Sequence, residues 1–175
     1  MTKTFNKTFK QFLTEYNLPY DFSFSVELPT DVKKIIADQI LSTELGITLK
    51  SFNRLHKATQ SWENQSIIED SENHFHVERY IEASDNKKAF MVGVKTLTLL
   101  AEKFQREGIK GVRFWYSFQT PELGRAWEKR NNFYEEDNEC FISDRLSFYK
   151  VRDNEDVILE NGIEDDFMAI LIIDI

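Results

Sequence analysis

The stretch Gly111-Val-Arg-Phe-Trp-Tyr-Ser-Phe118 is an aromatic strand pattern between two segments with helical spacing of apolar residues. The first helical segment starts near Lys88 and turns at Gly108, and the second follows Thr120-Pro121 and ends near Tyr134. A helix–strand–helix order predicts a sheet covered by helices. In such proteins ligands usually bind where a strand ends and the next helix begins.

The same periodicities predict elements along the rest of the chain. We expect helices over 5–16 and 30–45, a short helix over 49–55, and strands over 22–28, 66–69, 74–83, 145–151 and 167–173. The stretch 167–173 is apolar throughout, so it should be covered on both faces and lie inside the sheet. The expected class is α+β, a mixed, mostly antiparallel sheet of roughly five to seven strands flanked by helices.

The length of 175 residues favours one domain, with an N-terminal helix within 1–18 and a core over 74–151. The single cysteine, Cys140, excludes an internal disulfide, and carboxylates beside it disfavour a reactive thiolate. The sequence has neither a signal peptide nor an apolar run of membrane length. We therefore predict a cytoplasmic protein that does not bind membranes.

The net charge of −8 is concentrated at one end of the chain. Residues 153–175 carry eight acidic and no basic side chains, and the preceding residues are balanced. This distribution argues against nucleic-acid binding, which needs clustered Lys and Arg. The acidic segment 153–166 is expected to be a solvated loop or a docking surface for a basic protein partner. The residues predicted to bind that partner are Asp153, Glu155, Asp156 and Glu160.

The predicted strand over 74–83 places alternate polar residues on one face, among them His74, His76 and Glu78. Alternate side chains of a straight strand lie about 7 Å apart, too far to converge on one ion without further ligands. We therefore predict a solvated face without a metal, or general acid–base chemistry by His76 or Glu78. Separately, Lys87 and Lys88 open the long helix, where free amides favour an anion.

Three passages resemble the second half of the GNAT family of acyl-CoA-dependent N-acetyltransferases: Gly93–Leu97, Glu107–Phe114 and Trp127–Glu136. The resemblance covers roughly residues 74–151. It implies that acetyl-CoA would bind at the amino end of the long helix, near Lys87, Lys88 and Gly93. It also implies an acceptor groove near His76, Glu78 and Tyr116.

Two features of that family differ in this chain. Val92-Gly93-Val94 keeps one glycine of the family's phosphate loop, and Trp127 stands where a tyrosine often acts as general acid. Two hypotheses about function therefore remain open. The chain is an acyltransferase or a non-catalytic relative of one, or it is a small acidic immunity protein, antitoxin or inhibitor.

Overall fold

The computed structural model describes residues 1–44, 46–52, 64–81, 85–133, 141–153, 155, 163 and 165–175. The helices and strands, in chain order, are β1 (Thr2–Phe5), α1 (Lys7–Glu15), α2 (Thr30–Ala37), β2 (Ile40–Thr43), β3 (Gly46–Leu49), α3 (Gln65–Glu72), α4 (Asn86–Arg106), β4 (Val112–Gln119), α5 (Pro121–Arg130), β5 (Ser143–Lys150) and β6 (Ala169–Asp174). The expected α+β class is confirmed. One sheet has the order β1-β6-β4-β5 and the other pairs β2 with β3, and all these pairings are antiparallel.

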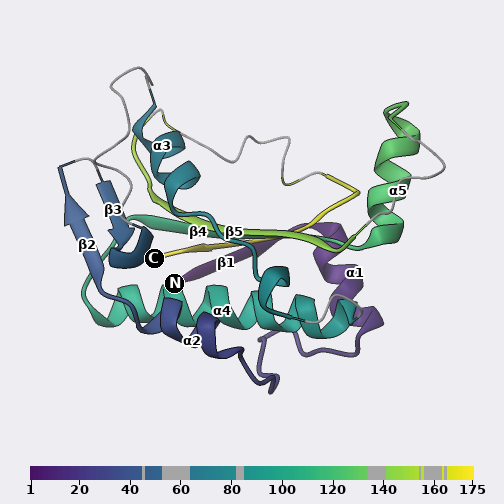
Figure 1. Ribbon diagram of the computed structural model, residues 1–175, viewed down its shortest axis with the longest axis horizontal. Coiled ribbons are helices and arrows are strands. Elements are labelled where there is room, and N and C mark those ends of the chain that lie inside the picture. Colours follow the sequence, from purple (N-terminus) through teal and green to yellow (C-terminus); the bar gives the residue numbers. More distant parts are fainter. Residues whose placement is uncertain are drawn as a thin grey trace.

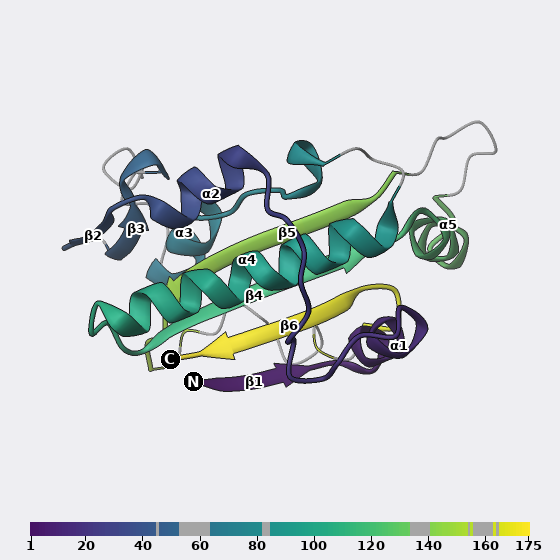
Figure 2. The ribbon, with the colours of Figure 1, turned by 90° about the horizontal axis from the view of Figure 1, so that it is seen from below.

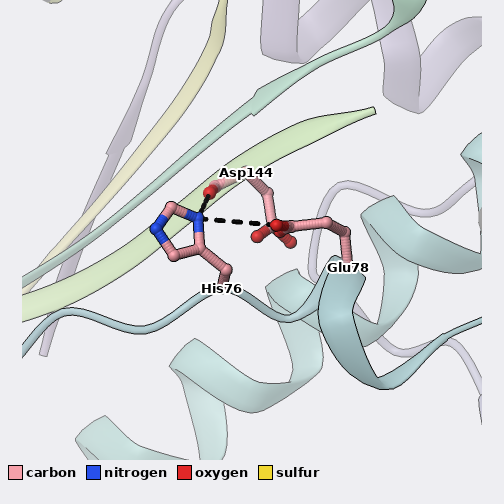
Figure 3. Close-up of side chains that lie close together, drawn as sticks. All are labelled: His76, Glu78 and Asp144. Carbon is pink, nitrogen blue, oxygen red and sulfur yellow. Dashed lines mark hydrogen bonds and ion pairs between the residues drawn. The ribbon is translucent and has the colours of Figure 1, made fainter. Parts of the chain in front are cut away.

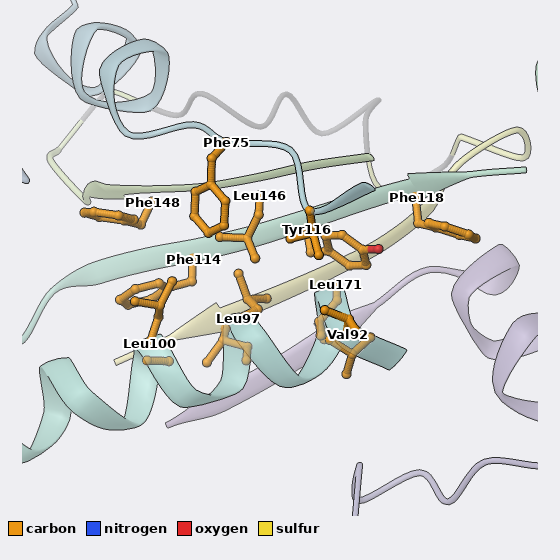
Figure 4. Packing of buried hydrophobic residues seen from close by; sticks show 14 of the residues in the cluster. Phe75, Val92, Leu97, Leu100, Phe114, Tyr116, Phe118, Leu146, Phe148 and Leu171 are labelled. Atoms are coloured by element: carbon orange, nitrogen blue, oxygen red, sulfur yellow. The ribbon is translucent and has the colours of Figure 1, made fainter. Parts of the chain in front are cut away.

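The long helix α4 lies along one face of the four-stranded sheet, and α3 lies on the opposite face (Figure 1). Alternate side chains of β4 are buried toward α4, as the sequence pattern predicts. Between helix and sheet, the centroid of the Phe104 ring lies 5.0 Å from that of Phe114 and 5.1 Å from that of Phe148. Both ring pairs are packed edge to face. Figure 4 shows this layer, in which leucines of α4 face the aromatic side chains of the strands. None of the described helices has both the length and the apolar character needed to cross a bilayer.

Strand β6 lies between β1 and β4, and its residues 169–173 are buried. The expectation of an apolar strand inside the sheet is therefore confirmed. The neighbouring strand β1 was not predicted, because Phe5 fits the apolar spacing of the helix that follows. Asn6 separates the two elements: its side chain caps α1 at Phe9 and also accepts a hydrogen bond from Ile170 of β6.

Helix α3 is held on β5 by polar side chains. The carboxylate of Glu69 is fully buried and accepts hydrogen bonds from Arg152, from the amide of Ile47 and from the amide of Lys150. Asp70 accepts from the Trp115 indole and pairs with Arg145 at 2.5 Å. Buried charges of this kind stabilise a fold only when they are fully partnered, so these contacts fix the position of α3.

The predicted strand over 22–28 does not form. The exposures of its residues alternate as expected, from half-buried Phe22 to buried Leu28, but the segment pairs with no described strand. Instead it crosses α4 (Figure 2), where the Lys95 ammonium donates to the Val26 carbonyl. The alternation of apolar and polar residues therefore indicates an extended chain, which here lies on a helix and not in a sheet.

The region between 30 and 73 also differs from expectation. The helix begins at Thr30 as predicted but ends at Ala37, and Ile40 and Gly46 belong to the β2–β3 hairpin. The predicted helix over 49–55 is a strand end followed by a 3₁₀ turn, and Leu55 lies outside the described residues. The predicted strand over 66–69 is part of α3. Of these elements, α3 and β3 are joined by the buried hydrogen bond from the Ile47 amide to Glu69, which local periodicity does not reveal.

We expect opposite effects from two glycine-to-alanine substitutions in helices. A Cβ at Gly93 in α4 would lie 2.1 Å from the Tyr116 ring, whereas one at Gly124 in α5 would lie 3.5 Å from its nearest neighbour. Gly93→Ala should lower the free energy of unfolding by about 1–3 kcal/mol through overpacking. Gly124→Ala should raise it by up to about 1 kcal/mol through helix propensity. Urea unfolding of both variants checks this, and equal midpoints would contradict the packing of Tyr116 on α4.

Candidate functional site

The segment after α3 forms one short contact with β5 and then turns. Phe75 and Leu146 exchange both backbone hydrogen bonds, at 2.9 and 3.0 Å. The next donor, the amide of Val77, binds the Asp144 carboxylate at 2.8 Å instead of a backbone carbonyl. A side chain thus replaces the ladder partner, and the chain enters a 3₁₀ turn over Glu78–Tyr80. The predicted strand is wrong over residues 74–81 for this reason, and residues 82 and 83 lie outside the described residues.

The turn brings together two of the predicted catalytic residues and a third that sequence reasoning missed. His76 Nδ1 lies 3.6 Å from Glu78 Oε1 and hydrogen-bonds the backbone carbonyl of Asp144. One side-chain donor atom from each of His76, Glu78 and Asp144 lies within 4.8 Å of the other two. Figure 3 shows the two carboxyl groups and the imidazole turned toward a common point. We call these three residues the acid–imidazole cluster.

The acid–imidazole cluster has an outer part and an inner part. The His76 and Glu78 side chains are 25% and 23% exposed, and Asp144 is 2% exposed on the core face of β5. Within the described chain, Asp144 Oδ2, Glu78 Oε2 and the Tyr116 hydroxyl are buried without a hydrogen-bond partner. Buried polar atoms are rarely left unpaired because each costs about 1–3 kcal/mol, so three of them together make this cluster a candidate site.

Burial and neighbouring charge also alter proton affinities here. Desolvation, followed by the proximity and charge of the Glu78 carboxyl, raises the pKa of Asp144 from 3.8 to about 9. Burial, with the charges of Asp144 and Glu78, raises the pKa of Tyr116 well above its ordinary value. The Asp144 carboxyl therefore keeps its proton near neutral pH.

Other predicted site residues lie apart from the cluster or have different surroundings. Lys87 and Lys88 are exposed in the first turn of α4. The Asp85 side chain caps the amino end of this helix. Lys88 also lines a surface cleft of about 390 Å³. Gly93 is two turns further along, buried beneath Tyr116, and so does not lie at the helix end. Tyr116, expected near an acceptor groove, is fully buried and so does not itself line an exposed surface.

Part of the predicted partner-binding segment is used inside the fold. Glu155 accepts hydrogen bonds from the amide and the hydroxyl of Ser66, both at 2.9 Å, and so holds the first turn of α3. Asp153 is exposed. Asp156, Glu160, Cys140 and Tyr134 lie outside the described residues. Of the described residues in this set, Asp153 alone fits the expectation of a solvated carboxylate.

A second candidate site, also missed from the sequence, is a cleft of about 650 Å³ between α1, the start of α4 and the start of α5. It is lined by Glu15, Glu122, Phe12 and Tyr16 together with neutral polar groups. The rings of Phe12 and Tyr16 are stacked, with 5.4 Å between their centroids and 2° between their planes. We call this the acidic–aromatic cleft. The i, i+4 spacing of Phe12 and Tyr16 indicated only a core-docked helix, so the sequence gave no sign of an open surface there.

We expect Asp144→Asn to change how stability depends on pH. Because folding raises the pKa of Asp144, its carboxyl contributes most below pH 3.8, and this contribution is lost as the pH rises toward about 9. Asparagine can still accept from Val77 and stays neutral. The free energy of unfolding of the variant should therefore improve relative to the wild type between about pH 5 and pH 9. Urea unfolding in EDTA-containing buffer tests this, with exposed Asp153→Asn as control. Parallel pH curves for wild type and Asp144→Asn would contradict it.

Comparison with known proteins places the chain in a family without identifying either site. No curated protein and no solved structure matches it. The family model of the Uncharacterized protein PM0498 family matches residues 4–175, which is nearly the whole chain. The chain therefore belongs to the Uncharacterized protein PM0498 family.

Proposed function

We propose that the chain is a small acidic protein-binding module that holds a basic partner in the acidic–aromatic cleft. The observation that carries this proposal is the lining of the cleft: two carboxylates and two stacked aromatic rings, with no basic side chain among its described lining residues. An arginine or lysine of a partner could stack on an aromatic face and pair with a carboxylate. The cleft volume of about 650 Å³ is within the range of small-ligand sites.

Tyr16 lies close to several carboxylates of the cleft. Burial, with the charges of Glu15, Glu122 and Asp85, raises the pKa of Tyr16 to about 12. Three carboxylates from α1, α5 and the start of α4 therefore act on one point. A cationic side chain placed there would relieve their mutual repulsion, which is why we expect the partner to be basic.

Helix α5, which forms one wall of the cleft, has the properties of an unpartnered interface. It has no buried residue, and it stands away from the sheet (Figure 1). Trp127 is 38% exposed and stacks on Phe133, which is 65% exposed, and Phe141 nearby in the sequence is 67% exposed. Isolated helices of fewer than about 12 residues are marginal in water, so a partner that covers this face would stabilise α5. Tryptophan is also prominent among residues that dominate binding energy.

Variants that remove charge or aromatic rings test whether the cleft and α5 capture a partner. We expect Glu15→Gln combined with Glu122→Gln to lose most binding, and Trp127→Ala combined with Phe133→Ala to lose about 30-fold or more in affinity. Glu27→Gln combined with Glu44→Gln removes the same net charge at exposed positions elsewhere and should bind normally. Each variant is immobilised and incubated with native lysate. The amount of each protein that salt elutes from it is then compared across the variants.

The control for the aromatic pair is Tyr80→Ala, because Tyr80 has the same 38% exposure as Trp127. Partners retained by both the Glu15/Glu122 variant and the Trp127/Phe133 variant, or lost equally from the charge control, would count against the proposal. Direct titration of an eluted partner then gives the salt dependence, which should be steep if charge pairing contributes.

A second candidate, acyl-CoA-dependent acyl transfer, is favoured by one observation. Lys88 lines a cleft with Thr30 and Tyr80, and Tyr80 belongs to the same turn as Glu78. An anion bound by Lys88 would therefore lie beside the segment that carries the predicted acid–base residues. This proposal has less support than the first, because Gly93 packs against the Tyr116 ring and does not lie at the helix end where acetyl-CoA was expected to bind.

Thermal unfolding with acetyl-CoA tests this second candidate. A ligand at one hundred times its Kd adds about 2.7 kcal/mol of stability, or roughly 5 °C or more in Tm for a chain of this size. Lys87→Ala combined with Lys88→Ala should abolish the shift, whereas Lys7→Ala combined with Lys10→Ala removes the same charge from α1 and should keep it. No shift at millimolar acetyl-CoA would exclude a CoA-dependent function.

A further inference from the structure

The acid–imidazole cluster has a property that partner binding does not use. His76, Glu78 and Asp144 come from a turn and from β5, and their donor atoms converge within 4.8 Å. The prediction of no metal rested on a straight strand, in which His76 and Glu78 would be too far apart to share an ion. The 3₁₀ turn removes that objection, because it folds Glu78 back to 3.6 Å from the His76 ring nitrogen.

We propose that His76, Glu78 and Asp144 bind a divalent transition-metal ion, with Zn²⁺ as the reference ion. One imidazole nitrogen and two carboxylates are a donor set that zinc sites use, with bonds of about 2.0–2.2 Å. Two such ligands at tetrahedral angles have their donor atoms about 3.4 Å apart, close to the 3.6 Å between His76 Nδ1 and Glu78 Oε1. His76 Nδ1 donates a hydrogen bond to the backbone carbonyl of Asp144, so metal binding would replace that proton with the ion.

An independent observation points to a ligand at this place. Asp144 is 2% exposed, and its Oδ2 has no hydrogen-bond partner among the described residues. The same holds for Glu78 Oε2. Two neighbouring buried carboxyl groups need a shared proton or a cation between them, and a metal ion that replaces the proton would pair with the buried oxygens of both.

The surroundings are suited to holding the ligands in place. Asp144 is oriented by the amide of Val77, which donates to its other oxygen, Oδ1. The Phe75–Leu146 backbone pair fixes the segment that carries His76 against β5. The buried Tyr116 hydroxyl is subject to the charge of Asp144 and can act as a donor to the ligating carboxylate. Such orienting hydrogen bonds commonly support metal ligands. The quarter-exposed His76 and Glu78 leave a path by which an ion can enter from solvent.

Isothermal titration of the EDTA-treated full chain with Zn²⁺, Co²⁺ and Mn²⁺ tests the site. We expect one ion per chain, with affinity rising from Mn²⁺ through Co²⁺ to Zn²⁺. His76→Ala, Glu78→Gln and Asp144→Asn should each weaken Zn²⁺ binding by at least about 10-fold. His74→Ala is the matched control, because the His74 ring lies only 5.6 Å from that of His76 but outside the cluster, and it should bind within about 2-fold of wild type.

Bound Co²⁺ provides a second readout, because its visible d–d absorption reports coordination and should be lost in His76→Ala. Circular dichroism establishes that each variant is folded, and the partly exposed positions of His76 and Glu78 favour this. Absence of binding at millimolar Zn²⁺ would overturn the proposal. Binding that is unchanged in His76→Ala and Glu78→Gln, or weakened equally by His74→Ala, would overturn it as well.

Discussion

Burial of one face of α4 against the four-stranded sheet is the interaction on which the rest of the structure depends. Each large side chain taken from water there contributes about 1.5–3 kcal/mol, and the contact surface runs the length of the helix. This packing also sets positions that matter for function. Because Gly93 has no side chain, the Tyr116 ring can lie against α4, and Asp144 occupies the same face of the sheet further along β5. The acid–imidazole cluster is thus an interruption in an otherwise apolar layer.

The elements that this layer contains could be predicted from the sequence. Apolar spacing located α4, β4, β5 and β6, because each of them buries side chains at a regular interval. Besides β1 and the extended segment 22–28, the elements that were missed or misassigned are α3, the β2–β3 hairpin and the turn after Val77. Their positions are decided by buried polar atoms whose partners are far away in the chain, such as Glu69 with Arg152 and Val77 with Asp144. Local periodicity carries no record of such pairings.

The two candidate sites show the same division. His76 and Glu78 could be named from the sequence as acid–base residues, but their convergence with Asp144 spans 68 positions in the chain. The acidic–aromatic cleft combines residues of α1 and α5, and each helix considered alone has an ordinary amphipathic pattern. Residue types were therefore predictable, whereas their meeting points required the fold. The acidic segment illustrates the converse, because Glu155 looked solvated and is bound to Ser66.

The central position of β6 has a consequence for the order in which the molecule can assemble. Strand β1 consists of residues 2–5, yet its hydrogen-bonding partners are residues 171–174. During synthesis at about 5–20 residues per second, β1 must wait many seconds with an unpaired edge before β6 emerges. Helix α4 and the β4–β5 pair have their partners much sooner. We therefore infer that the β4–β5 unit with α4 forms first. The sheet then closes in one late step that brings both ends of this chain together, and such long-range pairing slows folding.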